Sequence, residues 1–438
     1  MKKTLLLFSF TLFFLTLSAE NTAEFQSQLQ TISRVANVKT LSNSVGYASK
    51  FVLSFSQPLD HLHPEKGTFS QRIIVMHRAT NRPTVIVTEG YSANYALNPN
   101  YLEELSSLFN TNVIFVEHRF FAESTPSPCN WQYMTERNAM GDLHDIVTAF
   151  KTIYHNKWIS TGISKGGQTC MEFRAFYPQD VDISVPYVGP LCFAVEDGRH
   201  EPFLRQNGSE LDRKRIQDFQ TEILARKQHL LPAFETYCLK KNLHFNIPMR
   251  DVFDFCVLEY SFAHWQWGTP TSGIPATTAA DSTFLKELLA ISGPDYFAPN
   301  KDFTPFFYQA AYELGYYGYD MKPFKKLMSI KTTRNYLHRV MLPDSLNAVK
   351  YHPQLSRSVR KFLLQNDPKM IFIYGQIDPW TAAGVTWLKG KQNMHVFIQP
   401  GGSHLSRIKN MPPTLRDEIL QILSDWIGEK SQQLQKAA

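Results

Sequence analysis

The sequence lacks the marks of several large protein classes. It has no long run of lysine or arginine, so its formal charge of +6 gives little support for nucleic-acid binding. It contains no G-x-x-x-x-G-K-[ST] phosphate loop, and beyond its first residues no segment is long and apolar enough to span a membrane. Charged residues make up only 19% of the 438 residues, against 43% hydrophobic residues. This balance argues against disorder and predicts a large apolar core.

Groups for redox and metal chemistry are also few. The five cysteines are Cys129, Cys170, Cys192, Cys238 and Cys256. An odd number leaves at least one cysteine unpaired if all bridges are intramolecular. We expect Cys170 to be a buried free thiol and Cys238 to form a disulfide with Cys256. His61 and His63 flank a turn without further ligands nearby, so we expect no metal site and no cofactor.

Residues 1–19 have the pattern of a signal peptide. Lys2 and Lys3 precede an apolar stretch, and small residues end it at Ala19, where we expect cleavage. The alternative is an N-terminal membrane anchor, but the apolar stretch is short for a full span. No cysteine follows the leader, which argues against a lipid anchor. The sequence thus predicts an exported protein, periplasmic or secreted, with no membrane span after cleavage.

Short apolar runs alternate with helix-like stretches in the first and last parts of the chain. The strand-like runs are residues 51–55, 69–76, 84–88, 112–116, 158–161, 183–188, 370–374 and 394–398. Buried strands that alternate with helices indicate a mostly parallel, doubly wound sheet with helices on both faces. Residues 196–350 interrupt this pattern with helix-like segments rich in aromatic residues. We predict a catalytic domain of residues 20–195 and 351–438 with residues 196–350 as an inserted, mainly helical cap.

A G-x-S-x-G motif follows the strand-like run at residues 158–161. It consists of Gly162, Ser164 and Gly166 with one residue between each pair. In a nucleophile elbow, the serine of this motif lies on a strained turn between a strand and a helix, and the glycines allow close backbone packing. The motif alone also occurs in ordinary turns, so its interpretation depends on the rest of the chain.

Two further residues at predicted strand ends fit a catalytic triad. A serine nucleophile needs a base that takes its proton and an acid that orients the base. Asp378 and His404 follow the runs at 370–374 and 394–398, and the order Ser164, Asp378, His404 is that of α/β-hydrolases. Taken singly, Asp378 could be a turn residue before Pro379, and His404 could cap the last helix. Together they predict an α/β-hydrolase fold.

Backbone amides near the elbow are expected to form an oxyanion hole. Lys165, directly after the nucleophile, supplies one N–H, and Tyr91, in the loop after residues 84–88, is the best candidate for the other. An ordinary glycine turn at Gly90 is the alternative. Residues 117–119, Glu-His-Arg, end the next strand, where they form either a solvated charged strand end or a buried, ion-paired support.

Several motifs together resemble the bacterial S37 serine peptidases, the PS-10 or prolyl tri- and tetrapeptidyl aminopeptidase group. They are the segments 158–169, 116–121, 374–380 and 400–404. Residues 57–61 and 67–72 also resemble the related prolyl carboxypeptidase group. The resemblance spans about residues 50–410.

The resemblance implies an exported exopeptidase that releases tri- or tetrapeptides from free N-termini after proline, with Ser164, Asp378 and His404 as its triad. Its partner is a peptide substrate. Glu196 and Asp197 lie where the family has an acidic cluster for the substrate ammonium, although the preceding residues 191–193 differ from the family, and a solvated cap entrance is the alternative. The tryptophan candidates for a proline pocket are Trp380, Trp265 and Trp267. An ester hydrolase or lipase on the same fold and a non-catalytic binding protein remain alternative functions.

Overall fold

The computed structural model describes residues 22–42, 45–300 and 302–433. The predicted signal peptide, residues 1–19, lies outside the described residues. The described residues form two compact units: the first lies within residues 22–186, 368–371 and 413–433, and the second lies within residues 187–367 and 372–412. Within the described ranges, no helix combines the length and apolar character that a membrane crossing requires.

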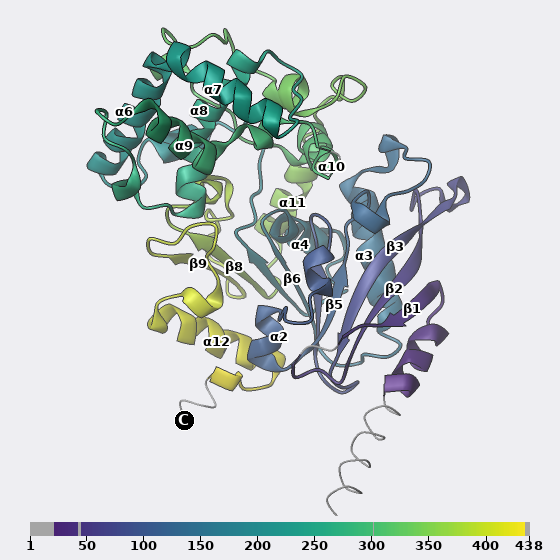
Figure 1. Cartoon of the computed structure of the whole chain (residues 1–438). Helices are drawn as coiled ribbons and strands as arrows, with labels where there is room; N and C mark the ends of the chain where they lie inside the picture. The colour runs from purple at the N-terminus through teal and green to yellow at the C-terminus, as the bar shows by residue number, and fades with distance from the viewer. Residues whose placement is uncertain (1–21, 43–44, 301, 434–438) are drawn as a thin grey trace, which may run out of the picture. The chain divides into compact units, whose positions relative to one another are not determined.

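The described residues contain one nine-stranded sheet with the order β1-β2-β3-β5-β4-β6-β7-β8-β9 (Figure 1). The strands are β1 (Val35–Thr40), β2 (Ser49–Pro58), β3 (Thr68–His77), β4 (Thr84–Thr88), β5 (Asn112–Val116), β6 (Trp158–Ile163), β7 (Ile183–Tyr187), β8 (Met370–Gly375) and β9 (Met394–Gln399). β1, β2, β3 and β5 pair in antiparallel fashion in that order, whereas β4 pairs in parallel with both β5 and β6. The chain therefore places β4, with its following loop, between β5 and β6.

The central strands are apolar along their whole length because both of their faces are covered. Every residue of β4, β5 and β7 is buried, whereas β2, nearer the edge, alternates between buried and partly exposed residues. The helices α2 (Glu104–Phe109), α3 (Glu136–Phe150) and α4 (Lys165–Phe176) lie between successive strands from β4 to β7. This topology, with a helical insertion, confirms the predicted α/β-hydrolase fold.

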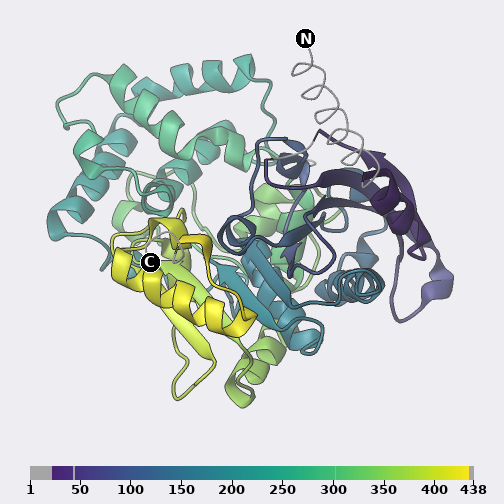
Figure 2. The same ribbon diagram turned by 90° about the horizontal axis from the view of Figure 1, so that it is seen from below.

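The first unit has its own apolar core on one face of the sheet. Residues 22–31 form a helix that contributes Leu29, and α3 contributes Ile146 and Phe150. These side chains pack against Phe51 of β2 and Ile73 of β3, and all five are fully buried. Figure 2 shows the 22–31 helix, in dark purple, beside the first strands. The unit also contains α12 (Pro413–Ile427).

The second unit is mainly helical. Its α-helices are α5 (His200–Leu204), α6 (Glu210–Ala225), α7 (Lys227–Lys240), α8 (Met249–Trp267), α9 (Asp281–Ser292), α10 (Thr304–Gln309) and α11 (Gln354–Gln365). Helices α6, α8 and α9 share an aromatic core, in which Phe219 stacks on Phe284 with ring centroids 5.2 Å apart. The unit also includes residues 187–195, 351–367 and 372–412. The boundaries of the catalytic domain and cap stay predictions.

None of the five cysteines, all of which lie in described segments, forms a disulfide. The predicted bridge between Cys238 and Cys256 is therefore wrong. Both thiols are fully buried in the apolar core of the second unit, where cysteine packs as a small hydrophobic residue. Cys170 is a buried free thiol, as predicted, and burial raises the pKa of its thiol to about 11.

Candidate active site

Ser164 lies on a strained turn between β6 and α4. Its backbone has φ 59° and ψ −120°, a conformation that residues with a side chain rarely adopt. Such strain costs about 1–3 kcal/mol and persists only where the surrounding structure enforces it. Ser164 is partly exposed, whereas Lys165 after it is buried. This is the geometry that the G-x-S-x-G motif predicts for a nucleophile elbow.

The two glycines of the motif allow backbone contacts that no other residue could make. A Cβ at Gly162 would lie 2.2 Å from the carbonyl oxygen of Gly166, and a Cβ at Gly166 would lie 2.7 Å from that of Thr88. The Thr88 hydroxyl donates hydrogen bonds of 3.0 Å to the carbonyls of Thr161 and Gly166. The end of β4 and the start of α4 are thereby held together, which maintains the strained turn at Ser164.

The loop after β4 packs directly on the first turn of α4. A Cβ at Gly90 would lie 2.6 Å from Cβ of Lys165 and 2.8 Å from the backbone nitrogen of Gly166. Tyr91 follows, and its carbonyl accepts a hydrogen bond of 3.1 Å from the His118 amide. The structure thus brings the loop that carries Tyr91 against Lys165. Their roles as oxyanion donors stay predictions.

The side chain of Lys165 belongs to a buried charged cluster behind the elbow. Its Nζ lies 3.4 Å from Oε1 of Glu136, and Nε2 of His118 lies 3.6 Å from the same oxygen. Burial alone would raise the pKa of Glu136, but Lys165 and His118 outweigh it and hold this pKa well below its usual range. Burial, with the nearby Lys165 charge, lowers the pKa of His118. The cluster holds Lys165 in place beside Ser164.

The Glu-His-Arg segment at residues 117–119 was predicted to be either a solvated strand end or a buried, ion-paired support. The side chains of Glu117 and Arg119 are both fully buried. Glu117 forms an ion pair with Arg72, and its Oε2 accepts a hydrogen bond of 3.0 Å from the Ala93 amide. Its Oε1 accepts from the amide and the hydroxyl of Ser124, at 3.1 and 2.9 Å. The segment is a buried, ion-paired support and not a solvated strand end.

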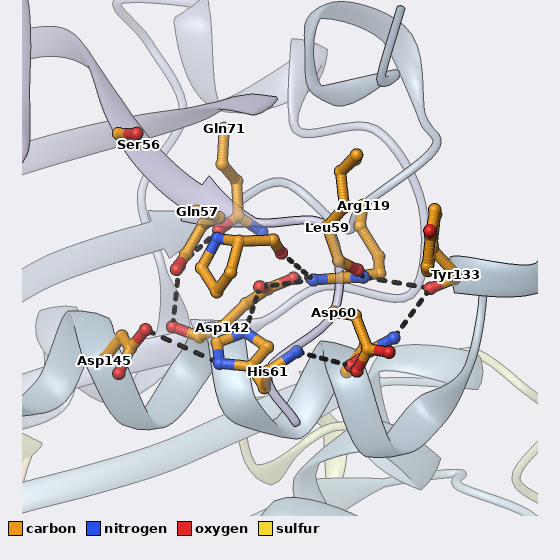
Figure 3. Close-up of polar contacts among 12 residues, drawn as sticks. Ser56, Gln57, Leu59, Asp60, His61, Gln71, Arg119, Tyr133, Asp142 and Asp145 are labelled. Atoms are coloured by element: carbon orange, nitrogen blue, oxygen red, sulfur yellow. Dashed lines mark hydrogen bonds and ion pairs between the residues drawn. The ribbon is translucent and has the colours of Figure 1, made fainter. Parts of the chain in front are cut away.

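Arg119 joins three segments of the first unit (Figure 3). Its Nε and Nη2 donate hydrogen bonds of 2.7 Å each to the two carboxylate oxygens of Asp142 in α3. Its Nη1 donates to the carbonyls of Leu59 and Tyr133, both at 2.9 Å. His61 also contacts Asp142, with Nε2 2.8 Å from Oδ1. The bidentate pair of Arg119 and Asp142 fixes the loop after β5 to α3.

Asp378 and His404 form a hydrogen-bonded pair in the second unit. Nδ1 of His404 lies 2.7 Å from Oδ2 of Asp378, and the two side chains are 6% and 0% exposed. The other oxygen of Asp378 accepts a hydrogen bond of 3.1 Å from the Trp380 amide. A Cβ at Gly375 would lie 2.3 Å from the Ser403 carbonyl, so a glycine is needed where the two loops meet. An aspartate on Nδ1 leaves Nε2 as the nitrogen for proton transfer.

The carboxyl end of α8 contacts the loop that carries His404. The carbonyl of Gln266 accepts a hydrogen bond of 2.9 Å from the His404 amide. The Trp267 ring meets the imidazole edge-on, with centroids 6.1 Å apart, and is 51% exposed. Gly268 ends the helix with φ 68°, close to Ser403. Helix α8 thus contacts His404, one of the predicted catalytic residues, directly.

The acidic pair Glu196 and Asp197 is held by different partners. Both oxygens of Asp197 accept hydrogen bonds from the Arg199 side chain, at 2.9 and 2.6 Å, and Oδ2 also accepts from the Phe193 amide. Glu196 is partly exposed, and its Oε1 accepts a hydrogen bond of 2.5 Å from the Asn335 amide. Asp197 is thus committed to an ion pair, whereas Glu196 has no cationic partner among the described residues.

Trp380 lies in an aromatic cluster, two residues after Asp378. Its side chain is 7% exposed, and its ring centroid lies within 5.5 Å of those of His200, Phe262, Tyr316 and Tyr317. Trp265 packs against Gly208 and is also buried. The role of Trp380 in binding proline stays a prediction.

Three carboxylates that the structure buries, Glu136, Glu172 and Glu259, are not predicted from the sequence as site residues. The available signal was a charged residue inside a mainly apolar stretch, as at Glu259 within residues 255–263 of α8. Within the described ranges no group of three His, Cys, Asp or Glu side chains could hold a metal ion.

Comparisons with known proteins place these features in a family. The family model of PS-10 peptidase S37 matches residues 21–438. The prolyl tri/tetrapeptidyl aminopeptidase of Streptomyces mobaraensis is 30% identical over 397 residues, 88% of this chain and 81% of that protein. The putative serine protease F56F10.1 of Caenorhabditis elegans is 30% identical over 34% of this chain and 30% of its own length. The solved proline iminopeptidase of Mycobacterium smegmatis is 13% identical, with a TM-score of 0.40, over 85% of this chain and 98% of that one.

Proposed function

Because the chain belongs to the S37 family of PS-10 peptidases and is therefore a serine peptidase, we propose that it releases tri- or tetrapeptides from free N-termini. We further propose that it prefers cleavage after proline. The similarity to a prolyl tri/tetrapeptidyl aminopeptidase along most of both chains supports both statements. The signal-peptide pattern of residues 1–19 supports export to the periplasm or the medium.

The reaction proceeds through an acyl-enzyme. The Ser164 hydroxyl attacks the carbonyl of the scissile bond while His404 takes its proton through Nε2, and Asp378 orients the imidazole through Nδ1. His404 then returns the proton to the leaving amine, and water releases the acyl group by the same steps. The observation that carries this proposal is the strained backbone of Ser164 between two glycines that no larger residue could replace.

The amides of Tyr91 and Lys165 stabilise the oxyanion of the tetrahedral intermediate. The close approach of Gly90 to Lys165 supports this assignment, since it sets the two backbone segments side by side. The buried ion pair of Lys165 with Glu136 adds rigidity, because preorganised donors need no rearrangement as the charge develops. The Lys165 side chain itself takes no part in proton transfer.

For the substrate, we assign Trp380 to the apolar pocket for proline and the Glu196–Asp197 segment to the region that receives the N-terminus. The buried ring of Trp380, two residues from Asp378, supports the first assignment. The absence of a cation beside Glu196 in the described part of the chain supports the second, whereas Asp197 is already paired with Arg199.

Labelling with a fluorophosphonate tests the nucleophile. The wild-type protein should be labelled once and Ser164→Ala not at all, whereas Ser282→Ala, an exposed serine in α9, should be labelled like the wild type. Hydrolysis of Ala-Ala-Pro-p-nitroanilide, with and without an N-terminal acetyl group, and of p-nitrophenyl acetate tests the substrate class. Turnover of the ester alone would show an ester hydrolase, and an unlabelled wild type would show a non-catalytic protein.

A further inference from the structure

Glu259 is a buried carboxylate without a cation. It lies in α8, and 5% of its surface is exposed. Its Oε2 accepts hydrogen bonds from the hydroxyls of Tyr317 and Tyr319, at 2.8 and 2.7 Å. Among the described residues, no group donates a hydrogen bond to Oε1, and no lysine, arginine or histidine forms an ion pair with the side chain. A buried carboxylate is costly unless a cation or further donors compensate it, so a positive ligand at Glu259 would be stabilised by its charge.

The surroundings of Glu259 are aromatic. Tyr317 stacks on Phe262 with ring centroids 3.7 Å apart, and Tyr319 contacts Tyr336 at 4.8 Å. The hydroxyl of Tyr296 lies 3.1 Å from that of Tyr317. These rings exclude water from the carboxylate, and the attraction between opposite charges is stronger where water is excluded. Carboxylate and rings together form a site suited to an organic ammonium group.

Helix α8 connects this site with His404. Glu259 and Gln266 are seven residues apart, so they lie on the same face of the helix about 10 Å from each other. The Gln266 carbonyl accepts the hydrogen bond from the His404 amide. Trp380 provides a second connection between the Glu259 site and the predicted catalytic residues. Its ring centroid lies 5.3 Å from that of Tyr317, and it follows Asp378 by two residues. Since an extended peptide spans about 3.3–3.6 Å per residue, a distance of about 10 Å corresponds to about three residues.

We propose that Glu259 binds the α-ammonium group of the peptide substrate, and that its spacing from His404 along α8 sets the length of the released peptide. The inference rests on the proposed aminopeptidase function and names the group that recognises the free N-terminus. Glu196 lies beside the same aromatic segment, because a Cβ at Gly318 would be 3.1 Å from its Cβ. It is more exposed than Glu259 and hydrogen-bonded to a backbone amide, which makes it a secondary contact.

The ionisation of Glu259 gives the site a distinct pH dependence. Burial raises its pKa to about 7, although the hydroxyls of Tyr317 and Tyr319 partly oppose this shift. The other titratable groups around it are Tyr296, Tyr336 and Cys256, and burial raises the pKa of each, so they stay neutral near pH 7. For a free peptide, kcat/KM should fall below about pH 7 as Glu259 takes up a proton. It should also fall above about pH 7.7–8, where the substrate amine loses its proton.

The test compares Glu259→Gln with wild type on Ala-Ala-Pro-p-nitroanilide, with free and acetylated N-termini. The variant should raise KM for the free peptide about 10- to 100-fold, because a hydrogen bond to a charged group is lost. KM for the acetylated peptide and hydrolysis of p-nitrophenyl acetate should not change. Glu287→Gln is the matched control, since Glu287 accepts a tyrosine hydroxyl, that of Tyr260 at 2.7 Å, elsewhere in the same unit.

The outcomes distinguish a failure of the proposed aminopeptidase function from a failure of the role of Glu259. If the wild type cleaves free and acetylated peptides equally well, the aminopeptidase function is wrong, and the ammonium site falls with it. If the wild type prefers the free peptide and Glu259→Gln keeps that preference, only the assignment of Glu259 is wrong. If Glu259→Gln does not fold, Glu259→Asp is used. Aspartate keeps the negative charge, but its shorter side chain moves the carboxylate away from the site, so KM for the free peptide should rise. An unchanged KM would overturn the assignment.

Peptide length gives a readout that a merely structural role would not change. Free peptides with two, three, four or five residues before the cleaved proline bond are compared at equal concentration. The wild type should show a clear optimum at three or four residues, and Glu259→Gln should lose the optimum. An optimum that persists in the variant would contradict the proposed role of α8 in measuring length.

Discussion

Replacing Arg119 by methionine should destabilise the first unit severely. Arg119 is fully buried, and its guanidinium donates two hydrogen bonds of 2.7 Å to Asp142. It also donates to the carbonyls of Leu59 and Tyr133 at 2.9 Å and to that of Pro58 at 3.2 Å. Methionine fills a similar volume but leaves the Asp142 charge buried with His61 as its remaining ionisable partner. Removing one member of a buried ion pair costs about 3–5 kcal/mol.

Urea unfolding at pH 7, followed by tryptophan fluorescence, measures this loss. The matched control is Lys157→Met, which removes a lysine from the exposed pair with Asp182, where the two side chains are 46% and 38% exposed. An exposed pair contributes about 0–1 kcal/mol, so the control should unfold close to the wild type. The double variant R119M/D142N removes both charges and should be more stable than Arg119→Met alone.

The pH dependence provides a second check. Burial tends to raise the pKa of Asp142, but Arg119 and His61 outweigh it and lower this pKa below its ordinary value. A carboxylate whose pKa is lower in the folded than in the unfolded protein stabilises the fold at pH values above its unfolded pKa. This stabilisation is lost as the pH falls below about 4. The difference between wild type and Arg119→Met should therefore narrow in acid. A destabilisation no larger than that of Lys157→Met would refute the reasoning.

Two further changes test the elbow and the proposed triad. Asp378→Asn should lower kcat about 10⁴-fold with little change in the unfolding midpoint, because the imidazole loses its orienting acid. Peptide hydrolysis near the wild-type rate would show that a different acid orients His404. Gly162→Ala should lower both kcat and thermal stability, since its Cβ would lie 2.2 Å from the Gly166 carbonyl, whereas Gly273→Ala, with no atom within 4 Å, should change neither. Equal melting temperatures for the two alanine variants would contradict the packing argument.

Much of the fold could be predicted because buried parallel strands are continuous apolar runs. The runs at residues 84–88 and 112–116 coincide with β4 and β5, and most other predicted strands were correct to within a few residues. β1 was not predicted, since none of its residues is buried and its sequence includes Asn37 and Lys39, which carry no strand signal. The disulfide between Cys238 and Cys256 was wrong because nearness in sequence does not show how two thiols are oriented.

The sequence by itself determined the features that depend on local residue type and order. The glycines around Ser164 have a local steric reason, and the order of serine, aspartate and histidine follows from the order of the strands. These features were sufficient to identify the fold and the peptidase family.

Only the tertiary structure decided which charged residues are paired. The resemblance to the family placed Asp197 in an acidic cluster for the substrate ammonium, but the structure pairs both of its oxygens with the Arg199 side chain. Glu259 was not among the predicted site residues, yet the structure buries it beside two tyrosine hydroxyls and leaves one oxygen without a donor among the described residues. The physical reason is that the energy of a charge depends on its burial and on how the side chains around it are oriented, and residue type and spacing record neither.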